Sequence, residues 1–84
     1  MRVIFTKSAA RDWARLPKRI QAQLRKKLNF FISQDYPLDA AIPMKDHTLG
    51  QYRFRIGDYR IVFDVTNHNI LVVIRAGHRK DIYR

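Results

Sequence analysis

The stretch YRFRIGDYRIVFDV, residues 52–65, decides the fold. Apolar and charged residues alternate on both sides of Gly57-Asp58, which is the pattern of two strands that each bury one face. Glycine accepts a positive φ without steric cost, so Gly57-Asp58 predicts a two-residue hairpin turn. The same alternation places Arg53 and Arg55 together on the face opposite the apolar residues. We therefore expect the arginines of this stretch to line an open face of the sheet.

The segments around this hairpin add two more strands. Residues 70–76, ILVVIRA, follow a turn at residues 66–69 and predict a strand apolar enough to lie centrally in the sheet. Residues 2–5, RVIF, predict a short N-terminal strand. Residues 34–50 contain two prolines and a glycine and keep no hydrophobic period, which indicates a long surface connection.

Two helices are predicted between the first strand and this connection. Ser8 is placed to cap a helix through AARDWARL, residues 9–16, and Pro17 suits the first turn of a second helix that runs to residue 33. The second helix has an apolar stripe, formed by Ile20, Leu24, Leu28, Phe31 and Ile32. Its opposite side is basic and carries Lys18, Arg19, Arg25 and Lys26. We expect the two helices to form an antiparallel hairpin with a basic outer face.

The order strand, helix, helix, strand, strand, strand predicts an α+β fold. The helical hairpin covers one face of the sheet, and the last three strands form an antiparallel meander. A chain of 84 residues is long enough for one domain and too short for two, so residues 1–84 are expected to form a single domain.

Composition narrows the classes of partner. Lysine and arginine number 17 against 7 acidic residues, all of them aspartate, for a net charge of +10. Such a chain is attracted to polyanions by counterion release, which leaves nucleic acid, the ribosome, an acidic membrane and an acidic protein as partners. The absence of cysteine excludes disulfides and thiolate metal sites. No apolar run approaches the roughly 20 residues that span a bilayer, and the N-terminus is too polar for a secretory signal, so we expect a cytoplasmic protein.

Two motifs resemble a known family. LGQYRFRIGDYRIVFDV, residues 49–65, and VVIRAGHRKDIYR, residues 72–84, resemble toxins of the RelE/ParE superfamily, most closely the RelE branch of type II toxin–antitoxin systems. The resemblance covers nearly the whole chain. It implies an mRNA interferase that enters the ribosomal A site and cleaves the messenger without a metal or other cofactor. It further implies that the ribose 2′-hydroxyl is the nucleophile, that a 2′,3′-cyclic phosphate is left, and that an extended, acidic antitoxin wraps the toxin.

The resemblance also assigns roles to individual residues. Arg53 and Arg55 take the places of a basic pair on a strand, and Arg60 that of the arginine that holds the scissile phosphate. Arg79 matches the arginine of a G-x-R turn, which serves as general acid or phosphate ligand, and Tyr83 matches a tyrosine that stacks on a nucleobase. Two further substrate-binding candidates lie near this set, Arg75 and Lys80.

The chemistry of RNA cleavage by a 2′-hydroxyl indicates one more candidate catalytic residue. Attack by a 2′-hydroxyl requires a base for its proton, cations for the growing phosphate charge and an acid for the leaving 5′ oxygen. Guanidinium groups suit the second task, but they remain protonated and serve poorly as bases. Histidine is the side chain that most readily exchanges a proton near neutral pH, so His78 is predicted to be catalytic. The alternative is that His78 only caps the turn after Gly77.

Each of the other residues has a structural alternative. Arg53 and Arg55 suit a solvated basic face, Arg60 and Arg75 suit ion pairs with nearby acids, and Tyr83 suits a cover for the core. Two other functions also fit the chain: a ParE-like toxin that poisons DNA gyrase, and an RNA- or ribosome-binding module without activity. The phosphate-cradling set on the sheet favours the endoribonuclease, because gyrase inhibition does not require it.

Overall fold

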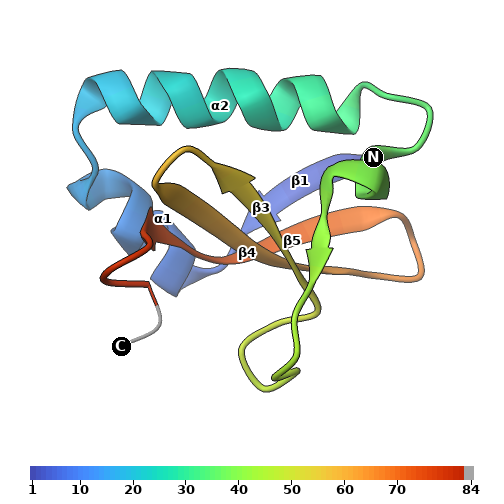
Figure 1. Cartoon of the computed structure of the whole chain (residues 1–84). Coiled ribbons are helices and arrows are strands. Elements are labelled where there is room, and N and C mark those ends of the chain that lie inside the picture. The colour runs from blue at the N-terminus through green and yellow to red at the C-terminus, as the bar shows by residue number, and fades with distance from the viewer. Residues whose placement is uncertain (83–84) are drawn as a thin grey trace.

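The computed structural model describes residues 1–82, in which two α-helices pack on a mixed five-stranded sheet (Figure 1). The strands are β1 (Arg2–Phe5), β2 (Ile42–Pro43), β3 (Tyr52–Ile56), β4 (Tyr59–Val65) and β5 (Ile70–His78). The helices are α1 (Lys7–Arg15), α2 (Lys18–Ile32) and the short 3₁₀ helix η1 (Pro37–Ala40). The strand order across the sheet is β1-β5-β4-β3-β2.

The predicted α+β fold is confirmed. β3, β4 and β5 form the antiparallel meander, and Gly57 takes a φ of 59° in the two-residue turn between Ile56 and Tyr59. β5 lies centrally, between β4 and β1, as its apolar sequence predicts. Two features of the sheet were not predicted. β1 pairs with β5 in parallel, and the expected surface connection contains η1 and the two-residue strand β2.

The core lies between α2 and the sheet. Alternate residues of β3, β4 and β5 point toward the helix and are fully buried, among them Phe54, Phe63 and Leu71. Phe54 stacks between Phe63, with ring centroids 4.5 Å apart, and Phe31 of α2, at 4.6 Å. Burying a side chain of this size stabilises the fold by roughly 1.5–3 kcal/mol. The sheet face that packs on α2 is therefore apolar, and the opposite face of the sheet is left for polar residues.

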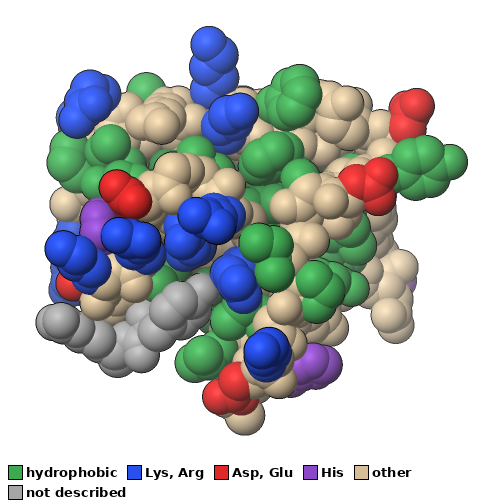
Figure 2. Space-filling model, in the orientation of Figure 1, with side chains coloured by type: hydrophobic (Ala, Val, Ile, Leu, Met, Phe, Trp, Pro, Cys, Tyr) green, Lys and Arg blue, Asp and Glu red, His purple; other side chains and the backbone are tan. Residues whose placement is uncertain are grey.

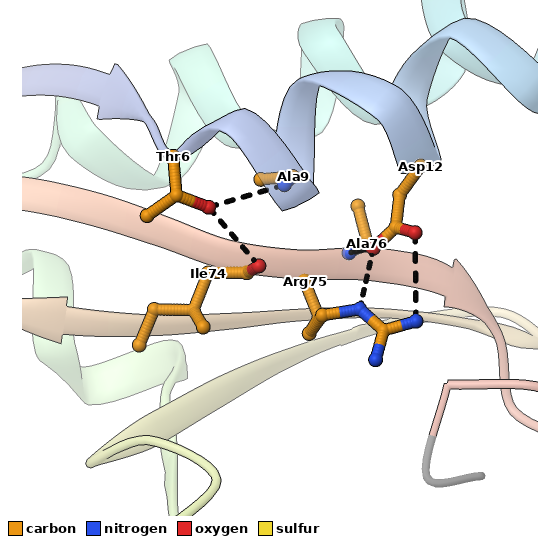
Figure 3. Close-up of polar contacts among 6 residues, drawn as sticks. All are labelled: Thr6, Ala9, Asp12, Ile74, Arg75 and Ala76. Atoms are coloured by element: carbon orange, nitrogen blue, oxygen red, sulfur yellow. Dashed lines mark hydrogen bonds and ion pairs between the residues drawn. The ribbon is translucent and has the colours of Figure 1, made fainter.

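α1 covers the edge of β5 that β1 leaves without a neighbouring strand. β5 extends beyond the end of β1, so the edge near Ile74 and Ala76 has no neighbouring strand there. Thr6 Oγ1 donates to the carbonyl oxygen of Ile74 at 3.3 Å, and the Asp12 carboxylate accepts from the Ala76 N–H at 3.1 Å (Figure 3). Thr6, and not Ser8 as the sequence suggested, is the N-cap, because its oxygen accepts from the Ala9 N–H at 3.1 Å. Thus α1 follows the edge of β5, whereas α2 crosses the sheet face (Figure 1).

The face away from α2 is only partly open. The segment from Met44 to Gly50 folds over Val62 of β4, and all three residues are buried. Gly50 has a φ of 144°, and a Cβ atom there would lie 2.6 Å from Val62 Cγ1, so only glycine fits this close approach. The expected surface connection therefore forms a wall on this face of the sheet.

Candidate functional site

The register of β3 and β4 places three arginines on the face away from α2. Arg55 lies directly opposite Arg60, and Arg53 lies directly opposite Val62. Residues directly opposite each other in antiparallel strands point to the same face. The arrangement that strand alternation predicted is therefore present, with Arg55 exposed and Arg53 and Arg60 half-buried.

A groove on this face is lined by Arg53 and Arg60, but not by Arg55. Its volume is about 500 Å³, within the roughly 300–1,000 Å³ typical of ligand sites. It lies between β2, the segment that follows β2, and the strands, and it is lined by Ile42, Pro43, Met44, Lys45, Asp46, Arg53, Arg60 and Arg79. We call this site the arginine groove. Figure 2 shows Lys and Arg side chains gathered below α2 over the strands.

Backbone carbonyls hold the Arg60 side chain. Its Nη1 atom donates to the carbonyl oxygen of Gly57 at 3.0 Å and to that of Tyr59 at 2.9 Å. Both carbonyls belong to the hairpin that connects β3 and β4. The guanidinium is therefore fixed by the same turn that the Gly-Asp pair predicts from sequence. Arg53 reaches the other wall of the groove, where its Nη1 lies 3.5 Å from Met44 Sδ.

Arg79 enters the arginine groove from the turn after β5. Its N–H donates to the carbonyl oxygen of Asp58 at 2.7 Å, and its Nε lies 3.7 Å from Asp58 Oδ1. The β3–β4 turn therefore contacts both Arg60 and Arg79. Lys80 follows in the same turn and is exposed, and Tyr83 lies outside the described residues.

Arg75 and His78 are not brought into the groove. Arg75 Nε pairs with Asp12 Oδ2 of α1 at 2.7 Å (Figure 3). The His78 ring meets Tyr59 edge-on at 5.4 Å, and its Nδ1 accepts from the Lys80 N–H at 3.1 Å. Both residues line a second pocket, of about 450 Å³, together with residues of α1. His78 thus caps the turn, which was the structural alternative.

A β-bulge explains the position of His78. Val62 pairs with Arg75 and Phe63 pairs with Val73, so Ile74 is an extra residue in β5. An extra residue reverses the face to which the following side chains point. His78 therefore shares the face of its partner Tyr59, which packs against the core. Without the bulge, simple alternation would place His78 on the face of Arg60.

Sequence reasoning missed Lys45 and Asp46, which line the arginine groove. The spacing Asp-x-Thr was the local signal, because an aspartate often binds a backbone N–H two residues later. Asp46 Oδ1 accepts from the Thr48 hydroxyl at 2.6 Å and from the Thr48 N–H at 3.0 Å. These two bonds, the hydroxyl first, lower the pKa of Asp46 below its ordinary value. The groove therefore contains an ionised carboxylate at neutral pH.

Two further features concern residues 1–82 as a whole. No group of three or more His, Cys, Asp or Glu side chains lies close enough to hold a metal ion in this part of the chain. Across the same residues, no helix is both long and apolar enough to cross a membrane.

Known proteins resemble this chain over nearly its full length. The family model described as "ParE toxin of type II toxin-antitoxin system, parDE" matches residues 3–83. Toxin RelG of Mycobacterium tuberculosis is 35% identical over 83 residues, which cover 98% of this chain and 94% of that protein. Toxin RelE3 of Methanocaldococcus jannaschii is 33% identical over 87 residues, which cover 99% and 96%.

Solved structures share the fold. A chain of the toxin–antitoxin complex RelBE2 from Mycobacterium tuberculosis gives a TM-score of 0.75 at 32% identity, covering 93% of this chain and 96% of that one. A chain of the RelB–RelE antitoxin–toxin complex from Methanococcus jannaschii gives 0.73 at 24% identity, covering 95% and 94%. From the family match, the identity to its relatives and the shared architecture, the chain belongs to the RelE/ParE superfamily of toxins of type II toxin–antitoxin systems.

Proposed function

We propose that this toxin is a ribosome-dependent endoribonuclease that cleaves mRNA in the A site and so inhibits translation. The observation that carries the proposal is the convergence of Arg53, Arg60 and Arg79 on one groove. Each guanidinium presents a planar fork of donors that matches phosphate oxygens. Such an arrangement suits a phosphodiester whose negative charge grows in the transition state.

The proposed reaction uses the ribose 2′-hydroxyl. Its oxygen loses a proton and attacks the adjacent phosphorus, and the bond from phosphorus to the 5′ oxygen of the next nucleotide breaks. That 5′ oxygen takes a proton from water, and a 2′,3′-cyclic phosphate remains. Arg60, held by two carbonyls, binds the non-bridging oxygens, while Arg53 and Arg79 neutralise charge from either side. In this proposal the arginines provide the charge stabilisation that a divalent ion provides in other nucleases. Cleavage that required a catalytic metal, on ribosomes kept intact, would contradict it.

Proton transfer is the second requirement. His78 lines the second pocket, whereas Asp46 lines the arginine groove. Asp46 is ionised at neutral pH, and Thr48 occupies only its Oδ1 atom among the described residues. We assign the 2′ proton to Asp46 because it is the carboxylate that lines the groove, and its lowered pKa makes it a weak base. In this proposal His78 holds the turn that carries Arg79.

A cognate antitoxin is the proposed partner. The solved relatives named above are complexes of a toxin with its antitoxin. With a net charge of +10, this toxin would capture an acidic, extended segment quickly, and salt would slow that capture. An association rate of the two proteins that did not depend on salt would count against an electrostatic capture.

One observation favours a second function. The matching family model describes ParE toxins, and the sequence also fitted a ParE-like inhibitor of DNA gyrase. An experiment can distinguish the two functions. The toxin is induced in a bacterial host, and messenger 5′ ends are mapped by primer extension. New ends inside translated frames, absent with Arg60→Ala, are the expected result. DNA breaks with an SOS response would favour gyrase, and ribosome association with neither effect would indicate a binding module without activity.

A further inference from the structure

We infer that Asp58 is a positioning residue, whose carboxylate orients the Arg79 guanidinium at the rim of the arginine groove. The inference rests on the proposed function, because it concerns how the same groove is assembled. Asp58 is not among the residues that line the groove. It would therefore act on the substrate only through Arg79.

The backbone of Arg79 is fixed from two sides. From one side, its N–H donates to the Asp58 carbonyl oxygen at 2.7 Å. From the other side, the His78 carbonyl oxygen accepts from the N–H groups of Asp81 and Ile82 at 2.9 and 3.0 Å. Ile82 is buried and anchors the end of this turn. The position of the Arg79 Cα atom is thus determined, and the long side chain is what remains to be oriented.

The Asp58 carboxylate is placed for that task. Its Oδ1 lies 3.7 Å from Arg79 Nε, and the two side chains are 65% and 55% exposed. An exposed pair of this kind contributes little to the stability of a fold. The pair instead sets the orientation of the guanidinium. An acid beside Nε leaves the two Nη groups free to bind a phosphate. The hairpin turn that holds Arg60 through its carbonyls would in this way also orient Arg79.

Side-chain NMR tests the contact without reference to catalysis. Asp58→Asn removes the charge but keeps a residue that is favoured in turns. We expect the order parameter of the Arg79 Nε–Hε bond to fall in this variant. Asp81→Asn is the matched control, since it removes the same charge from the turn that carries Arg79, and its carboxylate forms no ion pair within residues 1–82. An unchanged order parameter in Asp58→Asn, or an equal fall in both variants, would overturn the inference.

Cleavage kinetics test the consequence. Asp58→Asn should lower the single-turnover rate on saturating ribosomes by about three- to tenfold, and Asp58→Glu should restore most of it. In an Arg79→Ala background the same Asp58→Asn change should have no further effect. An equal loss in both backgrounds would show that Asp58 does not act through Arg79. If the wild-type toxin cleaves no message, the proposed function fails, and the NMR comparison still decides whether Asp58 orients Arg79.

Discussion

Arg60 is half-buried on β4, where two carbonyl oxygens of the neighbouring turn accept from its Nη1 atom. Donors that are fixed before the ligand arrives need little reorganisation in the transition state. Arg53 on β3 and Arg79 from the turn after β5 line the same groove. At the residue scale, the proposed activity therefore depends on the shape of the guanidinium group as well as on its charge.

Arg60→Lys should therefore lower the cleavage rate nearly as much as Arg60→Ala. An ammonium group is a point charge and does not replace a planar fork of donors. Loss of one such donor typically costs about 10²–10³ in rate. Single-turnover cleavage on programmed ribosomes measures the rates, and circular dichroism confirms that both variants fold. A lysine variant with wild-type activity would show that charge alone suffices, and an unfolded alanine variant would favour a structural role for Arg60.

Asp46→Asn should reduce cleavage about 10²-fold or more, because removing a general base has an effect of this size. His78→Gln should reduce it much less, since His78 lies outside the groove. A larger loss from His78→Gln would return the proton-transfer role to the histidine.

The charge of the Asp46 carboxylate depends on pH through its lowered pKa. Its carboxylate is ionised above that pKa and becomes protonated only as the pH falls below the ordinary range of aspartate. Thr48→Val removes the hydroxyl bond, so an NMR titration of the free toxin should find the pKa of Asp46 raised toward its ordinary value.

At the scale of elements, short-range patterns account for most of what the sequence could predict. The β3–β4 hairpin follows from alternation and Gly57-Asp58, which act over a few residues, and so does the shared face of Arg53, Arg55 and Arg60. β2 has two residues, one of them proline, and exists only because it pairs with β3. The bulge at Ile74, which turns His78 away, likewise depends on pairing between strands. Tertiary contacts, which no local pattern records, therefore decided the positions of β2 and His78, whereas the Asp-x-Thr spacing at Asp46 was a local signal.

The helix cap offers a test at this scale. Thr6→Ala should lower the free energy of unfolding by about 1 kcal/mol, because the Ala9 N–H loses its acceptor. The Ile74 carbonyl oxygen would lose a donor as well. Ser8→Ala should change it by less than about 0.5 kcal/mol, since Ser8 lies exposed within α1. Urea denaturation measures both variants, and equal losses would contradict the assignment of Thr6 as the cap.

At the scale of the whole molecule, positive charge is divided between two sides of the sheet. The arginine groove lies on the face away from α2, and α2 carries five exposed cations and no acidic residue between Lys18 and Ile32. The described residues form two ion pairs, Arg75–Asp12 and Arg79–Asp58, and neither involves α2. Under the proposed function, the outer face of α2 would contact ribosomal phosphates while the groove holds the message.

Neutralising part of α2 should separate binding from chemistry. The triple change Lys18→Gln, Arg19→Gln and Lys26→Gln should weaken ribosome binding, and each lost phosphate contact should reduce the slope of log affinity against log salt by about 1. The cleavage rate at saturating ribosomes should remain that of the wild type. Lys26→Gln alone is the control with a single lost charge, and it should weaken ribosome binding only slightly. A triple variant that binds normally but cleaves slowly would contradict this division of roles.

The most direct measurement of the central claim uses purified ribosomes that hold a defined message with an empty A site. Wild-type toxin and Arg60→Ala are each added, with naked message as the control, and the new RNA ends are mapped and their terminal phosphate identified. The account predicts one dominant cut in the A-site codon, a 2′,3′-cyclic phosphate on the upstream fragment, and no cut with Arg60→Ala or without ribosomes. An uncut message with wild-type toxin, or equal cutting by a folded Arg60→Ala variant, would contradict it.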